Sequence, residues 1–182
     1  MKKAVSLIVL AFLVALPAFG QAKPKTYNVL VAGGSEQNMI HIWLTPDGRS
    51  YLIESLVQLE VGGTICANPE GAPNELICEA SLIGSFEVNS GEGDDVVSVA
   101  GDVAVPVTLR GGAGDDILVG GASGDKLVGG PGNDKLVGRS GPDWLYGGAG
   151  DDRLIGGRGE DICRGGAGSD AVSSCETRKE IP

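Results

Sequence analysis

Aspartate recurs every nine residues in the second half of this 182-residue chain, a pattern that suits metal binding. A nine-residue repeat occupies residues 111–119, 120–128, 129–137, 138–146, 147–155, 156–164 and 165–173 without a gap. Its sixth position is Asp in all seven copies: Asp116, Asp125, Asp134, Asp143, Asp152, Asp161 and Asp170. An irregular copy at 90–98 carries Asp95 at the same position. If the repeats stack as strands do, about 4.8 Å apart, neighbouring carboxylates repel by roughly 1 kcal/mol in water. Such columns of charge require neutralisation.

The ligands that recur with the aspartates are hard oxygen atoms. Carboxylate and backbone carbonyl oxygens occur in every repeat, whereas histidine and cysteine do not recur, and this set selects calcium over zinc or copper. Magnesium demands tighter octahedral geometry and keeps more of its water, so stacked turns suit calcium better. Residues 90–173 contain 14 acidic and seven basic residues, a net charge of −7. Bound calcium ions would offset this charge.

The other positions of the repeat predict how the aspartates are placed. Glycines at positions 1, 2 and 4 allow positive φ and a sharp turn. Position 8 is apolar in every copy: Leu118, Leu127, Leu136, Leu145, Leu154, Cys163 and Val172. The last three positions suffice for a short strand whose middle side chain points to one face. Two repeats then make one coil, with a thin core inside and aspartate columns along two opposite edges. The predicted fold class is all-β.

The repeat resembles G-G-x-G-x-D-x-U-x, the nonapeptide of RTX, or hemolysin-type, calcium-binding proteins. The resemblance covers residues 90–173 and does not cover 23–89. It implies a parallel β-roll, a right-handed β-solenoid in which Ca²⁺ lies between turns one coil apart. With each ion held between one repeat and the next but one, about five or six Ca²⁺ ions are expected. It also implies that the ligands are the position-6 aspartates, Asp95 included, and the carbonyl oxygens of positions 1 to 4. The glycines expected at the best sites are Gly111, Gly112, Gly114, Gly129, Gly130, Gly132, Gly147, Gly148, Gly150, Gly165, Gly166 and Gly168.

The two edges of the predicted roll differ in sequence. Repeats one, three, five and seven share the odd edge, and repeats two, four and six share the even edge. The odd edge has Gly at positions 1, 2 and 4 throughout, whereas the even edge carries Ser123 at position 4, Arg139 at position 2 and Pro142 before Asp143. We therefore expect calcium to bind most tightly at the aspartates of the odd edge.

The N-terminus predicts export. Lys2 and Lys3 precede an apolar run, residues 4–16, which is shorter than the roughly 20 residues that a membrane-spanning helix needs. Small residues follow this run, as at a signal-peptide cleavage site. The expectation is a cleaved signal peptide over residues 1–22 and a secreted protein without a membrane span.

The rest of the chain divides around the repeats. A β-rich cap is expected over 23–89, a degenerate first coil over 90–110, the roll over 111–173 and a frayed polar tail over 174–182. Strands within the cap are expected at 27–31, 40–44, 50–53, 56–61 and 76–83, with a turn at 45–48. A section of this size is marginal alone, so we expect it to pack on the repeats.

Four cysteines fall into two pairs, each separated by 12 residues: Cys66 and Cys78, then Cys163 and Cys175. An even count in an exported chain favours disulfides, and sequence separation favours pairing within each pair among the three connectivities. Zinc binding is disfavoured because neither pair has CxxC spacing and the chain has one histidine. A 163–175 disulfide would close the last coil of the roll.

Composition narrows the function classes. Without residues 1–22 the net charge is −12, which disfavours a nucleic-acid partner. His41 is the single histidine, and no HExxH, GxSxG or phosphate-binding glycine motif occurs, so an enzyme is not expected. The predicted function is that of a secreted calcium-binding protein. The alternative is an extracellular adhesin or carbohydrate-binding module in which Ca²⁺ is purely structural and aromatic side chains supply the contact surface: Tyr27, Trp43, Tyr51, Trp144 and Tyr146.

Overall fold

The computed structural model describes residues 27–32, 35, 37–55, 60–61, 66–67, 69, 72 and 74–178. The predicted signal peptide, residues 1–22, lies outside this range. The described chain is all-β apart from one turn of 3₁₀-helix, η1 (Ala80–Leu82). No helix within the described ranges is long and apolar enough to span a membrane.

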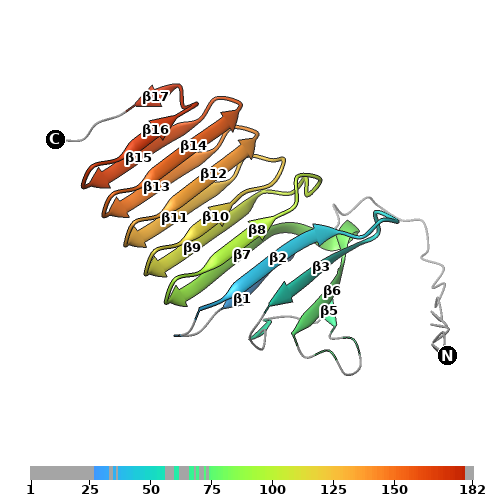
Figure 1. Ribbon diagram of the computed structural model, residues 1–182. Helices are drawn as coiled ribbons and strands as arrows, with labels where there is room; N and C mark the ends of the chain where they lie inside the picture. Colours follow the sequence, from blue (N-terminus) through green and yellow to red (C-terminus); the bar gives the residue numbers. More distant parts are fainter. Residues whose placement is uncertain are drawn as a thin grey trace, which may run out of the picture.

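Two sheets lie on opposite sides of a flattened coil, and the chain passes from one to the other at every repeat (Figure 1). The first sheet has the order β17-β15-β13-β11-β9-β7-β1-β4. Its strands are β1 (Tyr27–Ala32), β4 (Glu60–Val61), β7 (Ile83–Glu92), β9 (Val107–Ala113), β11 (Lys126–Pro131), β13 (Trp144–Ala149), β15 (Ile162–Ala167) and β17 (Thr177–Arg178). The second sheet has the order β16-β14-β12-β10-β8-β2-β3-β6-β5. Its strands are β2 (Met39–Leu44), β3 (Ser50–Ser55), β5 (Cys66–Ala67), β6 (Glu75–Glu79), β8 (Val96–Val99), β10 (Ile117–Val119), β12 (Lys135–Ser140), β14 (Arg153–Arg158) and β16 (Ala171–Ser173).

The repeats stack in parallel with a register of 18 residues, as two repeats per coil require. Leu136 pairs with Leu118 below it and with Leu154 above it. These leucines have no exposed surface, and the position-8 residues of the other sheet are equally buried. The prediction of an all-β parallel β-roll with a thin core of position-8 side chains is confirmed.

The first section of the chain contributes a coil of its own to the roll. β1 pairs in parallel with β7, and β2 pairs in parallel with β8. The expected turn follows β2: Gly48 has φ +68° and its N–H donates to the Thr45 carbonyl at 2.8 Å. Strands β3, β6 and β5 then extend the second sheet antiparallel.

The strand expected at 76–83 is interrupted in the structure. β6 ends at Glu79, η1 follows, and β7 begins at Ile83 in the other sheet. The interruption has a physical reason: β6 runs antiparallel in the second sheet, whereas β7 must run parallel in the first. Of the strand expected at 56–61, only β4 lies within the described residues.

Both expected disulfides are present, Cys66–Cys78 and Cys163–Cys175. Cys66 and Cys78 are directly opposite one another on β5 and β6. Each bridge closes a short loop, which in the chain-entropy account stabilises the fold by about 3 kcal/mol through the unfolded state.

Candidate metal centre

The position-6 aspartates form two columns, one at each edge of the roll. The backbone N–H of each aspartate donates to Oδ1 of the aspartate one coil later. These hydrogen bonds run from Asp95 to Asp116, Asp116 to Asp134, Asp134 to Asp152 and Asp152 to Asp170 on the odd edge, and from Asp125 to Asp143 and Asp143 to Asp161 on the even edge, at 2.8–3.0 Å. Every predicted aspartate ligand therefore lies beside its counterpart in the adjacent coil.

The second carboxylate oxygen has no hydrogen-bond partner in most of these residues. Six buried Oδ2 atoms are in this condition: those of Asp95, Asp116, Asp134, Asp143, Asp152 and Asp161. All six side chains are at most 2% exposed, whereas Asp170, in the last repeat, is half-buried. A buried carboxylate oxygen without a partner costs several kcal/mol unless a cation or donor meets it. Cations bound along the two columns would satisfy these six acceptor atoms.

Burial also disturbs the titration of these carboxyl groups. It raises the pKa of Asp116 and Asp143 to about 7 and that of Asp125 and Asp134 to about 6, against the stabilising effect of the backbone N–H donors. For Asp116, Asp134 and Asp143 the neighbouring carboxylates add to the rise. Since both effects disfavour the charged form, positive charge beside the columns would favour their ionisation.

The position-1 glycines leave room for the oxygen atoms to converge. A Cβ atom at Gly129 would lie 2.1 Å from Oδ2 of Asp134 and 2.7 Å from the carbonyl oxygen of Gly147 in the next coil. At Gly147 the corresponding atoms are Oδ2 of Asp152 and the carbonyl oxygen of Gly165. At Gly129 and Gly147 a carboxylate oxygen and a carbonyl oxygen of the next coil thus converge beside the glycine. We call the space beside a position-1 glycine and its aspartate a cradle.

This donor set fits calcium. Its oxygens are hard, and the backbone supplies a share of them. The described residues contain no cluster of three or more His, Cys, Asp or Glu side chains, so a site there would need backbone oxygens as further ligands.

The glycines at positions 2 and 4 allow adjacent coils to approach. Gly130 has φ +137°, and a Cβ atom there would lie 1.9 Å from the carbonyl oxygen of Gly112. The other predicted glycines of these positions share the positive φ: Gly112, Gly114, Gly132, Gly148, Gly150, Gly166 and Gly168. Side chains at these positions would hold the turns apart.

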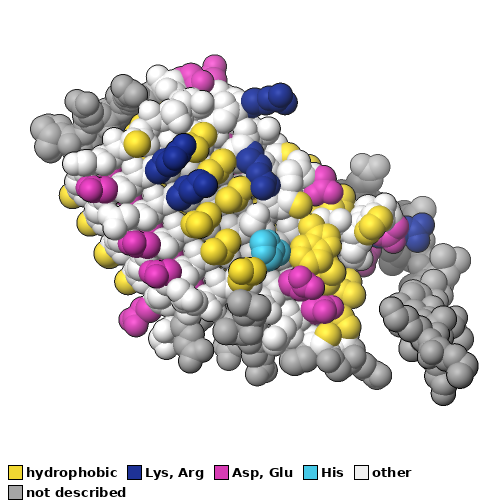
Figure 2. Space-filling view, in the orientation of Figure 1, with side chains coloured by type: hydrophobic (Ala, Val, Ile, Leu, Met, Phe, Trp, Pro, Cys, Tyr) yellow, Lys and Arg dark blue, Asp and Glu magenta, His cyan; other side chains and the backbone are white. Residues whose placement is uncertain are grey.

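The odd edge has a second ladder that the sequence analysis missed. At position 5, the backbone N–H of a residue donates to the side-chain oxygen of the position-5 residue one coil earlier, at 2.7–2.9 Å. The ladder consists of Asp94, Asp115, Asn133, Asp151 and Ser169. These side chains are exposed, and Figure 2 shows acidic side chains spaced along one edge of the roll. The sequence signal for this ladder was the recurrence of short polar side chains, Asp, Asn or Ser, at position 5 of the odd repeats.

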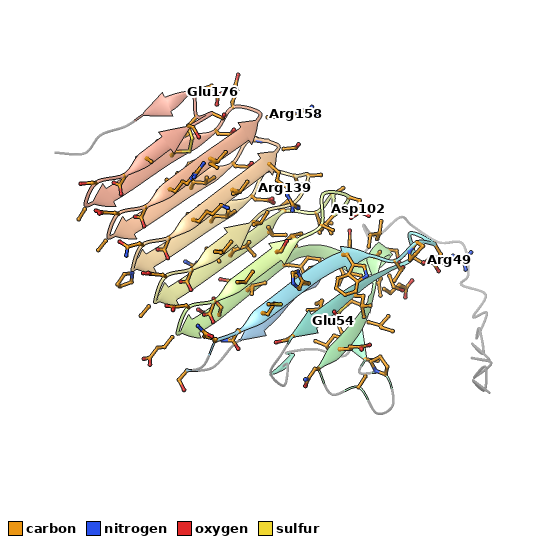
Figure 3. All side chains as sticks on the ribbon, in the orientation of Figure 1. Arg49, Glu54, Asp102, Arg139, Arg158 and Glu176 are labelled. Atoms are coloured by element: carbon orange, nitrogen blue, oxygen red, sulfur yellow. A yellow bond between two sulfur atoms is a disulfide. The ribbon has the colours of Figure 1, made fainter. Side chains whose placement is uncertain are left out.

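At the start of the even edge, backbone N–H groups and a guanidinium meet the oxygen atoms that a metal ion would otherwise bind. Val107 takes the place of an aspartate, and its N–H donates to Oδ1 of Asp125 at 3.0 Å. Oδ2 of Asp125 accepts the N–H of Gly121 at 2.7 Å, so this carboxylate has no unmet oxygen. Nη1 of Arg139 donates to the carbonyl oxygens of Val99 and Gly120. The Arg139 guanidinium (Figure 3), at a residue with φ +80°, therefore supplies positive charge here from the protein itself.

At the start of the odd edge, a neutral residue outside the repeats hydrogen-bonds to Oδ1 of Asp95, whereas Oδ2 of Asp95 has no partner. The N–H of Asn38 donates to Oδ1 of Asp95 at 2.6 Å, and its Nδ2 donates to the Ser90 carbonyl at 2.9 Å. The Ser90 hydroxyl donates to the carbonyl of Gly111 at 3.0 Å. Asn38 lies outside the repeats, and its only sequence signal is its place directly before a strand.

The aromatic residues are distributed unequally. Tyr51 is buried with its ring edge against Phe86, at 5.1 Å between centroids, so it offers no contact surface and that expectation is wrong. Trp144 and Tyr146 face outward as predicted, and the Lys126 and Arg164 charges lie over the Tyr146 ring. The Tyr27 side chain lies outside the described residues.

The single histidine lies on the outer face of the second sheet. His41 lines an open hollow of about 590 Å³ together with Trp43, Ser98 and Arg139, and no carboxylate or cysteine lines it.

Comparison with known proteins adds one match. A family model described as "RTX calcium-binding nonapeptide repeat (4 copies)" matches residues 108–136 and 137–172. No curated protein and no solved structure matches the chain.

Proposed function

Because the repeat region, residues 108–172, belongs to the RTX calcium-binding nonapeptide repeats, we propose that this chain is a calcium-dependent structural protein. One observation carries the proposal: six buried aspartate Oδ2 atoms without partners, stacked in columns beside glycine cradles. Bound Ca²⁺ supplies the positive charge that these oxygens lack. Since the columns form only when the coils stack, the free energy of binding adds to the free energy of folding.

About five or six ions are proposed, in line with the six unmet Oδ2 atoms. The carboxylates hold them together with the position-1 carbonyls of the next coil. Asp170 contributes Oδ1 to the coil before it and closes the odd edge. The Asp95 cradle differs because Ser90 occupies the glycine position.

We further propose that the protein acts outside the cell. Two disulfides indicate a non-reducing environment, and the predicted signal peptide supports export. Extracellular calcium modules bind in the range of roughly 10⁻⁴–10⁻³ M. No catalytic role is proposed, and a glycan-binding role would rest on the outward-facing rings of Trp144 and Tyr146.

Calcium titration tests the proposal. In chelator at pH 7.5 the far-UV β signal should be incomplete, and it should rise with Ca²⁺ while magnesium at the same concentration has a smaller effect, because Mg²⁺ requires tighter geometry. Isothermal titration calorimetry should count about five or six ions. A β signal already complete in chelator and unchanged by millimolar calcium would contradict the proposal.

The two edges provide a matched pair of variants. Asp134→Asn on the odd edge removes a charge whose Oδ2 is unmet, so it should abolish one site or weaken it roughly tenfold or more. Asp125→Asn should leave the ion count unchanged. The Gly121 N–H already donates to Oδ2 of Asp125, and the Arg139 guanidinium already donates to the nearby carbonyl oxygens. Calorimetric counts for both variants are the measurement. A larger loss in Asp125→Asn would contradict the unequal edges.

A further inference from the structure

The C-terminal end of the even edge contains a shortened repeat that the nonapeptide pattern does not reveal. The N–H of Asp161 donates to Oε2 of Glu176, and the N–H of Glu176 donates back to the Asp161 carbonyl at 3.1 Å. Glu176 directly precedes β17, which pairs with β15, just as Asp161 directly precedes β15. Glu176 therefore takes the place of a position-6 aspartate, although it follows Asp161 by 15 residues instead of 18.

The backbone of this shortened repeat also takes the expected place. A Cβ atom at Gly156 would lie 2.0 Å from the Ser174 carbonyl oxygen and 2.6 Å from Oδ2 of Asp161. The same arrangement joins Gly129, Asp134 and the Gly147 carbonyl in the odd edge. Ser174 reaches this place with φ +53°, one of two described non-glycine residues with positive φ.

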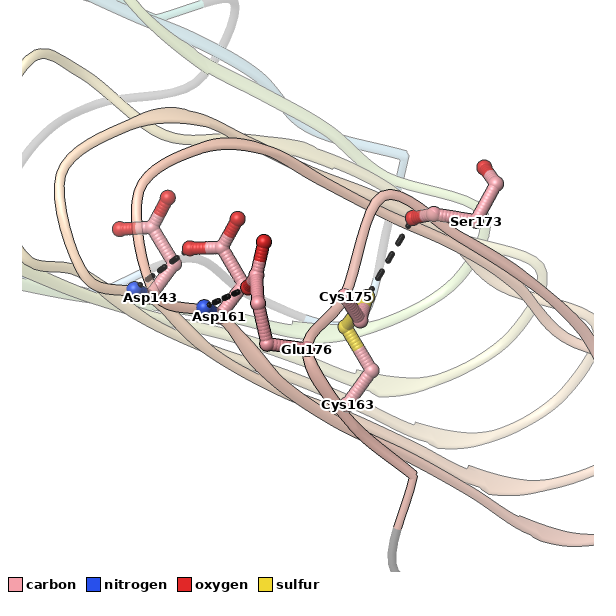
Figure 4. Close-up of a disulfide and its surroundings, with 6 residues drawn as sticks. All are labelled: Asp143, Asp161, Cys163, Ser173, Cys175 and Glu176. Carbon is pink, nitrogen blue, oxygen red and sulfur yellow. Dashed lines mark hydrogen bonds between the residues drawn. A yellow bond between two sulfur atoms is a disulfide. The ribbon is translucent and has the colours of Figure 1, made fainter.

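One polar atom at this end points to a ligand. Asp161 has no exposed surface, and its Oδ2 has no hydrogen-bond partner. Oδ2 and the Ser174 carbonyl converge on the same side of Gly156. Figure 4 shows the Glu176 carboxylate against the Asp161 backbone. Two negatively charged side chains and a carbonyl thus meet with no basic side chain hydrogen-bonded to either carboxylate among the described residues.

We propose that Asp161, the Ser174 carbonyl and Glu176 form a terminal calcium site that the Cys163–Cys175 disulfide holds in place. This proposal rests on the proposed calcium-binding function and adds one ligand that the repeat pattern does not contain. This repeat is three residues shorter than the others, so its backbone follows a different path. The longer side chain of glutamate still reaches the Asp161 N–H, which explains why glutamate replaces aspartate here.

The disulfide connects the two halves of this site. Cys163 lies two residues after Asp161 at an inward position of β15, and Cys175 lies between Ser174 and Glu176. β17 is the last strand of its sheet among the described residues, and the bridge and the pairing of β17 with β15 attach the shortened repeat to the coil below. Breaking the bridge would release the Ser174 carbonyl and Glu176 together.

Calorimetric ion counts on the full chain test the site. Glu176→Gln keeps an oxygen that accepts the Asp161 N–H and removes only the charge, so it should bind one ion fewer or bind that ion roughly tenfold more weakly. Glu160→Gln changes an exposed glutamate directly before Asp161, and its ion count and affinities should match those of the wild type. The double variant Cys163→Ser/Cys175→Ser should weaken the same ion, and adding Glu176→Gln to it should produce no further loss.

Three outcomes would overturn the proposal: an unchanged count in Glu176→Gln, an equal loss in Glu160→Gln, or additive losses for the disulfide and Glu176 variants. A wild-type protein that binds no calcium would instead refute the proposed function. Retention of the remaining ions in Glu176→Gln separates the two cases.

Discussion

Gly130→Ala is expected to prevent the first and third repeats from stacking. The new Cβ atom would lie 1.9 Å from the backbone carbonyl oxygen of Gly112, and φ +137° is a conformation that alanine rarely adopts. Neither strain can be relieved by a side-chain movement, because the colliding atom belongs to the backbone. We expect a loss of at least about 3 kcal/mol in the free energy of unfolding of the calcium-loaded protein, which corresponds to a fall in Tm of roughly 6–12 °C.

Gly101→Ala provides the control. No atom lies within 4 Å of a Cβ built at Gly101, and its φ is outside the positive region. Thermal unfolding in excess calcium should therefore give the wild-type Tm for Gly101→Ala. Equal Tm values for both variants would show that the close approach of the turns does not hold the roll together.

Acidification is expected to stabilise the calcium-free roll. Burial raises the pKa of Asp116 and Asp143 to about 7 and that of Asp134 to about 6, whereas an unfolded chain has its aspartate pKa values near 3.9. A raised folded-state pKa means that the folded roll binds more protons than the unfolded chain. This contribution to stability is therefore complete below about pH 4 and is lost as the pH rises through 6 to 7.

The measurement is the far-UV β signal in calcium-free buffer between pH 8 and pH 5. The signal should increase as the pH falls, with a midpoint between about pH 6 and pH 7. Calcium affinity should change in the opposite direction and weaken over the same range, because protons compete with Ca²⁺ for the carboxylates. A calcium-free β signal that is constant or decreases from pH 8 to pH 5 would contradict this account.

The repeats themselves were predictable because every coil reproduces the same local constraints. An apolar residue at position 8, glycines in the turn and a period of nine leave one way to bury Leu118, Leu136 and Leu154 together. The aspartate columns follow from the same period, since residues 18 apart must stack. The disulfides followed from short sequence separation.

The ends of the two columns were not predictable in this way. Asn38, Arg139 and Glu176 act on residues one or more coils away, and neither Asn38 nor Glu176 lies in a repeat of the standard length. An insertion before Val107 and a deletion before Glu176 shift the spacing that identifies position 6. Only the strand pairing places these residues in the columns.

The sequence by itself therefore determined the β-roll, its core and its calcium-type donor set, because those features repeat with a fixed period. The stacking of the coils determines which aspartates keep an Oδ2 atom without a partner. Asp125 keeps none, whereas Asp95 and Asp161 keep theirs although Asn38 and Glu176 hydrogen-bond to them. The physical reason is that a cradle forms between two coils, so a residue far away along the chain supplies half of its contacts.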